Sequence, residues 1–115
     1  MDGRSTDGIE GWHAHVYFDA DSRDAARTMH EGIGAVFPEA EIGRFHEKPV
    51  GPHPMWSFQI AFGPDDFGRI VPWLGLNRGG LDVFVHPKTD NDRADHSDHV
   101  MFLGRSHTLD LSIFD

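Results

Sequence analysis

The chain has 115 residues, a length that typically forms one domain with one hydrophobic core. The absence of cysteine excludes disulfide bonds, thiolate metal sites and cysteine nucleophiles, and it fits a cytoplasmic protein. The net charge of -9, with histidine counted as neutral, disfavours nucleic acid as a partner, and no apolar run approaches the roughly 18 residues of a membrane span. The chain also contains 9 histidines, and histidine is the commonest metal ligand.

The first predicted elements are a strand and a helix. Residues 1–10 are polar and show no periodicity, so we expect a flexible segment before a single domain over residues 11–115. Residues 12–18 alternate between apolar and polar side chains, which predicts a strand with one buried face. Apolar residues at three- and four-residue spacing then predict an amphipathic helix between Ser22 and Phe37.

The middle of the chain predicts two strands and a second helix. Residues 41–46 form a short, weaker strand pattern, and residues 55–62 alternate clearly. The loop between them contains three prolines. A second amphipathic pattern follows over residues 65–76, in which Pro72 is expected to kink or interrupt the helix.

The last third predicts strands separated by a charged loop. Residues 81–86 alternate and form a strand, whereas residues 87–98 are charged and loop-like. Residues 101–104 are expected to pair briefly, and residues 108–114 alternate as a C-terminal strand. The resulting order is β-α-β-β-α-β with one extra strand, which predicts an α+β, ferredoxin-like antiparallel sheet with both helices on one face.

The alternation places three histidines on the sheet face that the helices leave open. His13 and His15 lie next but one to each other on the first strand, about 6.6–6.8 Å apart at Cα. In the ferredoxin-like order the first and last core strands are antiparallel neighbours, which brings His86 beside His13. We therefore predict that His13, His15 and His86 bind one metal ion, for which nitrogen ligands favour Fe(II), Zn(II) or Mn(II).

Two further histidines are candidates for acid–base or supporting roles. His53 stands between Pro52 and Pro54, where a stiff loop can hold a side chain at low entropic cost or can be a purely structural turn. His96 lies three residues before His99, next to aspartates that could orient an imidazole, although a solvated loop is the alternative. The remaining histidines are expected to be solvated surface residues: His30, His46, His99 and His107.

Other side chains could complete the site. A metal shell of two histidines and one carboxylate could draw on Asp82, Asp95 or Glu47. Arg44 and Arg78 flank turns near the open face, where either could bind a substrate carboxylate or simply be surface charge. Tyr17 lies on the same face as the histidines and is a third candidate for substrate contact.

The chain resembles the DOPA 4,5-dioxygenase family through motifs that occur in order over about residues 11–111. The motifs are Trp12-His13-Ala14-His15-Val16-Tyr17-Phe18-Asp19, Pro49-Val50-Gly51-Pro52-His53-Pro54, Asn77-Arg78-Gly79 with Leu81, Val85-His86-Pro87, and Asp95-His96 with Leu103-Gly104. The resemblance implies a compact ferredoxin-like domain, often dimeric, that cleaves a catechol by extradiol chemistry with a non-haem iron. Phe102 stands where the family pattern has Trp, and residues 88–93 lack an expected glycine.

Two hypotheses follow. The first is an extradiol dioxygenase that uses Fe(II), or zinc as a substitute, to open DOPA or a related catechol with O2; His13, His15 and His86 bind the metal, and His53 and His96 act as acid–base groups. The alternative is a non-catalytic ferredoxin-like dimer that binds a small molecule or zinc. Both hypotheses include a homodimer, because Tyr17, Met55 and Phe84 would otherwise be exposed on the open face, and residues 108–114 could pair with a partner.

Overall fold

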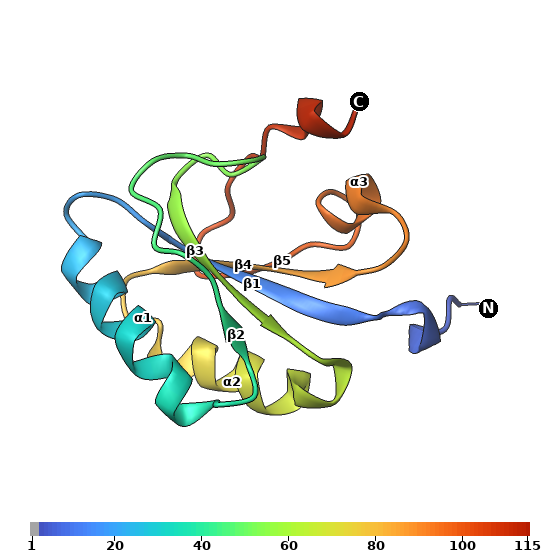
Figure 1. Cartoon of the computed structure of the whole chain (residues 1–115). Coiled ribbons are helices and arrows are strands. Elements are labelled where there is room, and N and C mark those ends of the chain that lie inside the picture. The colour runs from blue at the N-terminus through green and yellow to red at the C-terminus, as the bar shows by residue number, and fades with distance from the viewer. Residues whose placement is uncertain (1–2) are drawn as a thin grey trace.

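The computed structural model describes residues 3–115, which form an α+β fold with a five-stranded antiparallel sheet and three helices (Figure 1). The strand order is β2-β3-β1-β4-β5. The bounds are β1 Gly11–Phe18, α1 Arg23–Val36, β2 Glu41–Ile42, β3 Trp56–Phe62, α2 Phe67–Asn77, β4 Asp82–Lys88, α3 Asp92–Asp95 and β5 Met101–Leu103, with 3-10 helices η1 Thr6–Gly8, η2 Pro64–Asp66 and η3 Leu111–Phe114.

The core lies between the sheet and helices α1 and α2, which cover the same face of it (Figure 1). The apolar positions of the alternating strands are fully buried there, as predicted: Ala14, Val16, Phe58, Ile60, Val83 and Val85 are all 0% exposed. Ile33 of α1 and Ile70 and Leu74 of α2 pack against them. Burial of one such side chain contributes about 1.5–3 kcal/mol, so this face fixes which residues point away from the helices.

Helix α2 continues through Pro72, so of the two effects expected of this proline, a kink or an interruption, the interruption does not occur. The proline removes the backbone hydrogen bond to Gly68, four residues earlier. Both Pro72 and Gly68 are exposed, so water can reach the carbonyl that loses its partner. The remaining turns are fixed by Ile70 and Leu74, which are both buried in the core.

The predicted C-terminal strand over residues 108–114 is wrong, because this segment is irregular and ends in η3. The edge of the sheet beside β4 is already occupied by β5. Asp110 instead caps η3 by accepting a hydrogen bond from the Ser112 N–H, and its own N–H donates to the carbonyl of Pro52 at 2.9 Å. The segment therefore packs over the loop that precedes β3.

The charged stretch 87–98 is more ordered than predicted. Strand β4 continues through Lys88, and α3 begins after Asn91, whose side chain accepts a hydrogen bond from the Ala94 N–H. In the predicted N-terminal segment, residues 3–10 contain η1, and the Glu10 N–H donates to the Lys88 carbonyl; residues 1–2 of this segment lie outside the described residues. None of the helices in residues 3–115 combines the length and apolar character needed to cross a membrane.

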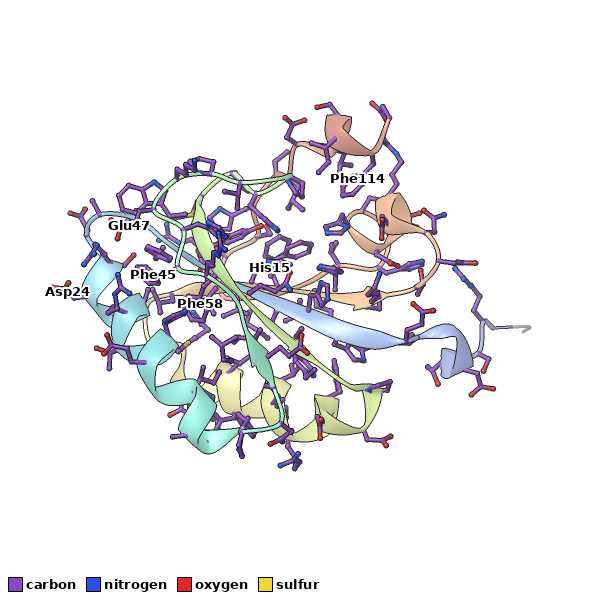
Figure 2. The ribbon with its side chains drawn as sticks, viewed as in Figure 1. His15, Asp24, Phe45, Glu47, Phe58 and Phe114 are labelled. Carbon is purple, nitrogen blue, oxygen red and sulfur yellow. The ribbon has the colours of Figure 1, made fainter. Side chains whose placement is uncertain are left out.

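The second face of the sheet is covered rather than open. Tyr17 is 1% exposed and Phe84 is 0% exposed, which contradicts the exposure predicted for them, and Met55 is half-buried. Their cover comes from the loop before β3 and from the segment after β4, where Phe114 lies on the side of the sheet opposite α1 and α2 (Figure 2). Exposed aromatic groups on this face therefore give no reason for a homodimer, which stays a prediction.

Candidate metal centre

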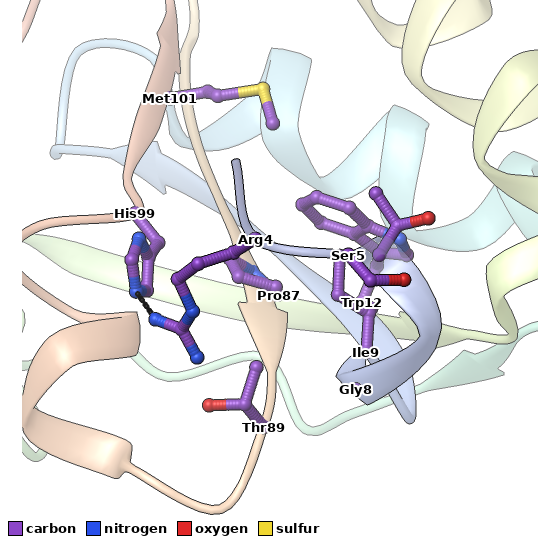
Figure 3. Close-up of a pocket in the computed structure, with 10 residues that line it drawn as sticks. Arg4, Ser5, Gly8, Ile9, Trp12, Pro87, Thr89, His99 and Met101 are labelled. Carbon is purple, nitrogen blue, oxygen red and sulfur yellow. Dashed lines mark hydrogen bonds between the residues drawn. The ribbon is translucent and has the colours of Figure 1, made fainter. Parts of the chain in front are cut away.

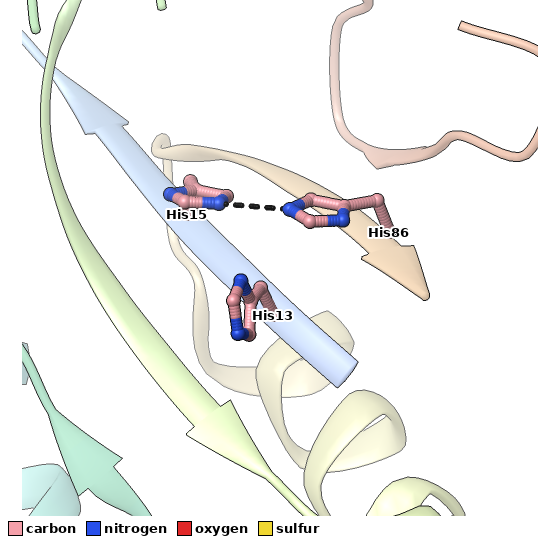
Figure 4. Close-up of side chains that lie close together, drawn as sticks. All are labelled: His13, His15 and His86. Atoms are coloured by element: carbon pink, nitrogen blue, oxygen red, sulfur yellow. Dashed lines mark hydrogen bonds between the residues drawn. The ribbon is translucent and has the colours of Figure 1, made fainter. Parts of the chain in front are cut away.

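Three histidines meet at the centre of the covered face, on the two strands that lie side by side in the middle of the sheet (Figure 4). The register of β1 and β4 places His13 directly opposite His86, and His15 is two residues further along β1. Each of the three offers one ring nitrogen, and these nitrogens lie within 4.8 Å of one another. The convergence predicted from alternation and strand order is confirmed.

The donor chemistry of this cluster fits a transition-metal ion. The Nε2 atoms of His15 and His86 face each other at 3.2 Å. Two imidazoles bound to one ion at about 2.1 Å place their nitrogens about 3.0–3.4 Å apart for angles between 90° and 109°. His86 Nδ1–H donates to the carbonyl of Pro87 at 2.8 Å, which leaves the lone pair of a neutral His86 on Nε2, toward His15.

Burial keeps these imidazoles neutral near pH 7. Desolvation lowers the pKa of His86 to about 3 and the pKa of His15 well below its usual 6.5, and the neighbouring histidines lower the pKa of His15 further. The pKa of half-buried His13 is also lowered, first by burial and then by Lys88. A proton therefore competes weakly with a metal ion for these nitrogens at neutral pH.

The three candidate carboxylates are bound elsewhere. Asp82 accepts hydrogen bonds from the Arg105 N–H and from His107 Nε2, and Glu47 forms ion pairs with Arg23 and Arg27 near α1. Buried Asp95 accepts from the N–H and the hydroxyl of Thr89. The clustered nitrogen ligands thus come from histidine alone.

His53 and Tyr17 form a hydrogen-bonded pair beside the cluster. His53 is 8% exposed, and a turn in which its N–H donates to the Val50 carbonyl holds its backbone. The Tyr17 hydroxyl lies 2.7 Å from His53 Nδ1, and the ring of His53 is 4.1 Å from that of His15. Burial lowers the pKa of His53 to about 4 and raises that of the Tyr17 hydroxyl, so both groups are neutral at pH 7.

His96 contacts the cluster at His86, whereas His53 contacts it at His15. His96 caps the C-terminus of α3, where its Nδ1–H donates to the Asp92 carbonyl at 2.7 Å. Its ring centroid is 4.1 Å from that of His86 and 4.7 Å from that of Phe114. The structure therefore brings both predicted acid–base candidates, His53 and His96, against the three predicted ligands.

The two arginines predicted to bind substrate do not reach the cluster of His13, His15 and His86. Arg44 is exposed and does not line the pocket next to them. The Arg78 guanidinium donates to the carbonyls of Leu81 and Gly79, and it lines a separate pocket with Tyr17 and His107.

Some histidines expected to be solvated are structural. His30 is half-buried and bonds the Gly43 carbonyl, and His107 is paired with Asp82. His46, also expected to be solvated, is half-buried and lines a pocket with His15 and His53. Its bridge to Ser57, which pairs with Tyr17, places it on the histidine face; this pairing is too short to be read from periodicity.

Two pockets are relevant to ligands. The pocket beside the histidines has a volume of about 190 Å³, and its wall consists of His15, His46, Val50, Gly51, Pro52, His53, Ser57 and Gln59. A second, mostly apolar pocket of about 260 Å³ lies under residues 4–9, between Trp12 and Met101, where Arg4 contacts His99 at 3.3 Å (Figure 3). Only the first pocket contacts the three-histidine cluster.

Comparisons with known proteins identify the family of the chain. A crystal structure of a protein from Nostoc punctiforme, described as a "putative dioxygenase", superposes with a TM-score of 0.92 at 48% identity, over 96% of this chain and 95% of that one. An uncharacterized 21.2 kDa protein of Botryotinia fuckeliana is 39% identical over 92% of this chain, and a DOPA 4,5-dioxygenase of Amanita muscaria is 30% identical over 90%. The chain spans 64% and 49% of the lengths of these two relatives. The Dopa 4,5-dioxygenase family matches residues 12–113, and this chain belongs to that family.

Proposed function

We propose that the protein is a non-haem, iron-dependent extradiol dioxygenase that opens the ring of DOPA or a related catechol with O2. The observation that carries the proposal is the buried cluster of His13, His15 and His86 beside a pocket that also contacts His53. The net reaction breaks one ring carbon–carbon bond next to the diol and places both oxygen atoms in the product. Family membership and the name of the Amanita muscaria relative support the same reaction.

His13, His15 and His86 would hold the metal ion through neutral imidazole nitrogens. When bound, an Fe(II) ion would supply the Lewis-acid and redox chemistry that the reaction requires. Because the three ligands lie on two paired central strands, the sheet itself would fix their spacing. The Pro87 carbonyl would keep the lone pair of His86 on the ligating nitrogen.

The catechol would bind in the 190 Å³ pocket. His15 and His53 form the side nearest the cluster, and Ser57, Gln59 and His46 provide polar groups around the pocket. His53 lines this pocket and would exchange protons with the catechol oxygens. His96 packs against His86 outside the lining of the pocket and would support the metal ligands. The lining contains neither lysine nor arginine, so no cationic side chain of this pocket would bind the carboxylate of DOPA.

We also infer that the fold is the ferredoxin-like split βαβ arrangement. The element order β1-α1-β2-β3-α2-β4 and the sheet order β2-β3-β1-β4 support this assignment, with β5 added at the edge.

The test is to load the protein anaerobically with Fe(II), add DOPA or other catechols, and admit air. We expect oxygen uptake, a yellow ring-opened product, and incorporation of both atoms of labelled O2. His86→Ala should abolish the activity, while His99→Ala, which alters a histidine outside the cluster, should retain it. If no catechol in a broad panel consumes oxygen while iron is bound, the protein is not this enzyme.

A further inference from the structure

The hydrogen bonds of the histidines in and beside the cluster fall into two kinds. His86 and His96 each donate Nδ1–H to a backbone carbonyl, at 2.8 and 2.7 Å, so a neutral ring presents a lone pair at Nε2. His53 differs because its Nδ1 faces the hydroxyl of Tyr17 instead of a carbonyl. A hydroxyl can donate as well as accept, so the direction of this bond decides where the proton of His53 lies.

The surroundings of Tyr17 favour donation by the hydroxyl. Tyr17 is 1% exposed, and in the described part of the chain its oxygen has no side-chain or backbone partner except His53. If His53 donated instead, the phenolic proton would have no acceptor among the described residues, and leaving a buried group unpaired costs about 1–3 kcal/mol. When Tyr17 donates, His53 Nδ1 is the acceptor and the ring proton of neutral His53 must lie on Nε2.

The Nε2 atom of His53 opens toward the pocket. It has no hydrogen-bond partner among residues 3–115, and no side-chain nitrogen or oxygen in this range is both buried and unpaired. His53 Nε2 is therefore accessible, and the space that His53 lines together with His15 is the 190 Å³ pocket. An N–H at this position is free to donate a hydrogen bond to a ligand in the pocket.

We propose that Tyr17 is a positioning residue that fixes His53 as the Nε2–H tautomer, so that His53 donates a hydrogen bond to an oxygen of the bound substrate while His86 and His96 present lone pairs. The role toward substrate rests on the proposed function, but the tautomer does not. One fold thus makes chemically different groups from the same residue type: His53 is a donor, and His86 is an acceptor available to a metal ion.

The decisive experiment is two-bond 1H–15N correlation NMR on the metal-free protein at pH 7.5, which reports the tautomer of each histidine ring. His53 is assigned from the signals that disappear in His53→Gln. We expect the wild-type His53 ring to be protonated on Nε2 and the ring of His86 to be protonated on Nδ1. In Tyr17→Phe, His53 should become a mixture of tautomers. A wild-type His53 protonated on Nδ1 would overturn the assignment.

Control variants separate hydrogen bonding from packing. Tyr17→Phe keeps the aromatic ring that contacts Phe84 and His107, so it removes little besides the hydroxyl. His107→Gln removes a ring that packs on Tyr17 without touching the bond to His53, and it should leave the His53 tautomer unchanged. If His107→Gln changes the tautomer as much as Tyr17→Phe does, packing rather than the hydroxyl sets it.

The iron-loaded enzyme gives an independent reading. Tyr17→Phe should lower kcat by about 10- to 100-fold with little change in KM or in iron content, the size typical of losing a group that orients a neighbour. If the wild-type enzyme is active and Tyr17→Phe has the same kcat, the hydrogen bond between Tyr17 and His53 has no role in catalysis. If the wild type has no catechol activity but shows the predicted tautomers, the proposed function fails and the role of Tyr17 as a positioning residue stands.

Discussion

The Nε2 atoms of His15 and His86 lie 3.2 Å apart on neighbouring strands, and the Nδ1–H of His86 is already given to the Pro87 carbonyl. A neutral His86 therefore accepts at Nε2, and His15 must be the donor in the metal-free protein. A metal ion would take the place of that single proton between the two rings. His15 and His86 can thus pair with each other without a metal and are already oriented to bind one.

Removal of either ring from this pair should remove the metal site. We expect His15→Ala or His86→Ala to weaken Zn(II) binding by more than about 100-fold, because even loss of an outer-shell partner typically costs 10–100-fold. Isothermal titration with Zn(II) measures this directly. His99→Ala, outside the cluster, should bind like the wild type. Retained affinity in His86→Ala would show that the ion binds elsewhere.

Acid should destabilise the metal-free protein through its buried histidines. The pKa values of His53 and His86 fall from 6.5 in the unfolded chain to about 4 and about 3 in the folded protein. The unfolded state therefore binds more protons below pH 6.5, so stability is fully present above this pH and is lost as the pH falls toward 3. Chemical denaturation at pH 7.5, 6 and 5 should show a decreasing free energy of unfolding, with a smaller decrease in His86→Gln.

Gly104 should not tolerate a side chain. Its φ of +91° disfavours any L residue, and a Cβ there would lie 2.4 Å from Asp82 Oδ1 and 2.7 Å from the Arg78 guanidinium. We expect Gly104→Ala to lower the free energy of unfolding by about 1–3 kcal/mol. Gly80→Ala is the matched control, because a Cβ at Gly80 meets nothing within 4 Å. Equal thermal stability of the two variants would contradict the prediction.

Asp95 should stabilise the loop that leads to His96. Its carboxylate accepts two hydrogen bonds from Thr89 and is 1% exposed, so Asp95→Ala leaves two half-buried donors without a partner. We expect a loss of about 2–4 kcal/mol in the free energy of unfolding, measured by denaturant titration. The control Asp90→Ala changes an exposed aspartate in the same loop and should stay within about 0.5 kcal/mol of the wild type.

Deletion of residues 108–115 should damage the site rather than an interface. This segment bonds Pro52 through Asp110 and covers His96 with Phe114. Without it we expect Zn(II) affinity to fall by about 10-fold, as for loss of an outer-shell partner, and the oligomeric state to stay the same. Isothermal titration measures the Zn(II) affinity, and light scattering measures the oligomeric state. A change from dimer to monomer would show that this segment forms an interface between subunits.

The predicted homodimer is tested by light scattering of the intact protein at micromolar concentration. A dimer would have to use a surface other than the covered histidine face, and Leu76 of α2, 87% exposed, is the most exposed large apolar side chain of the described residues. A mass near 12.9 kDa would contradict the prediction.

The three-histidine cluster was predictable because it depends on two local rules. Alternation fixed the faces of β1 and β4, and chain connectivity made these strands antiparallel neighbours, so His13, His15 and His86 had to converge. Neither rule needs knowledge of distant contacts.

The cover of the site could not be predicted in the same way. Its contacts join segments that are far apart in the chain, such as Asp110 with Pro52 and His96 with Phe114. The spacing of apolar residues in the sequence does not indicate such contacts. The alternating pattern of residues 108–114 was misleading, because apolar side chains there pack over the site instead of pairing at an edge that β5 already fills. The Tyr17–His53 bond was missed for the same reason.

The direct pairing of His13 with His86 also limits where the chain can accept an inserted or deleted residue. Side chains on a strand alternate with a period of two, so one inserted or deleted codon early in β1 would shift the register and turn His13 and His15 toward the helices. The same shift would put Ala14 and Val16 among the remaining site residues, so core and site would fail together. Insertions should therefore be tolerated in the turn at Gly79-Gly80 but eliminated from β1, and selection of random single-codon insertion libraries for folded protein would map this boundary.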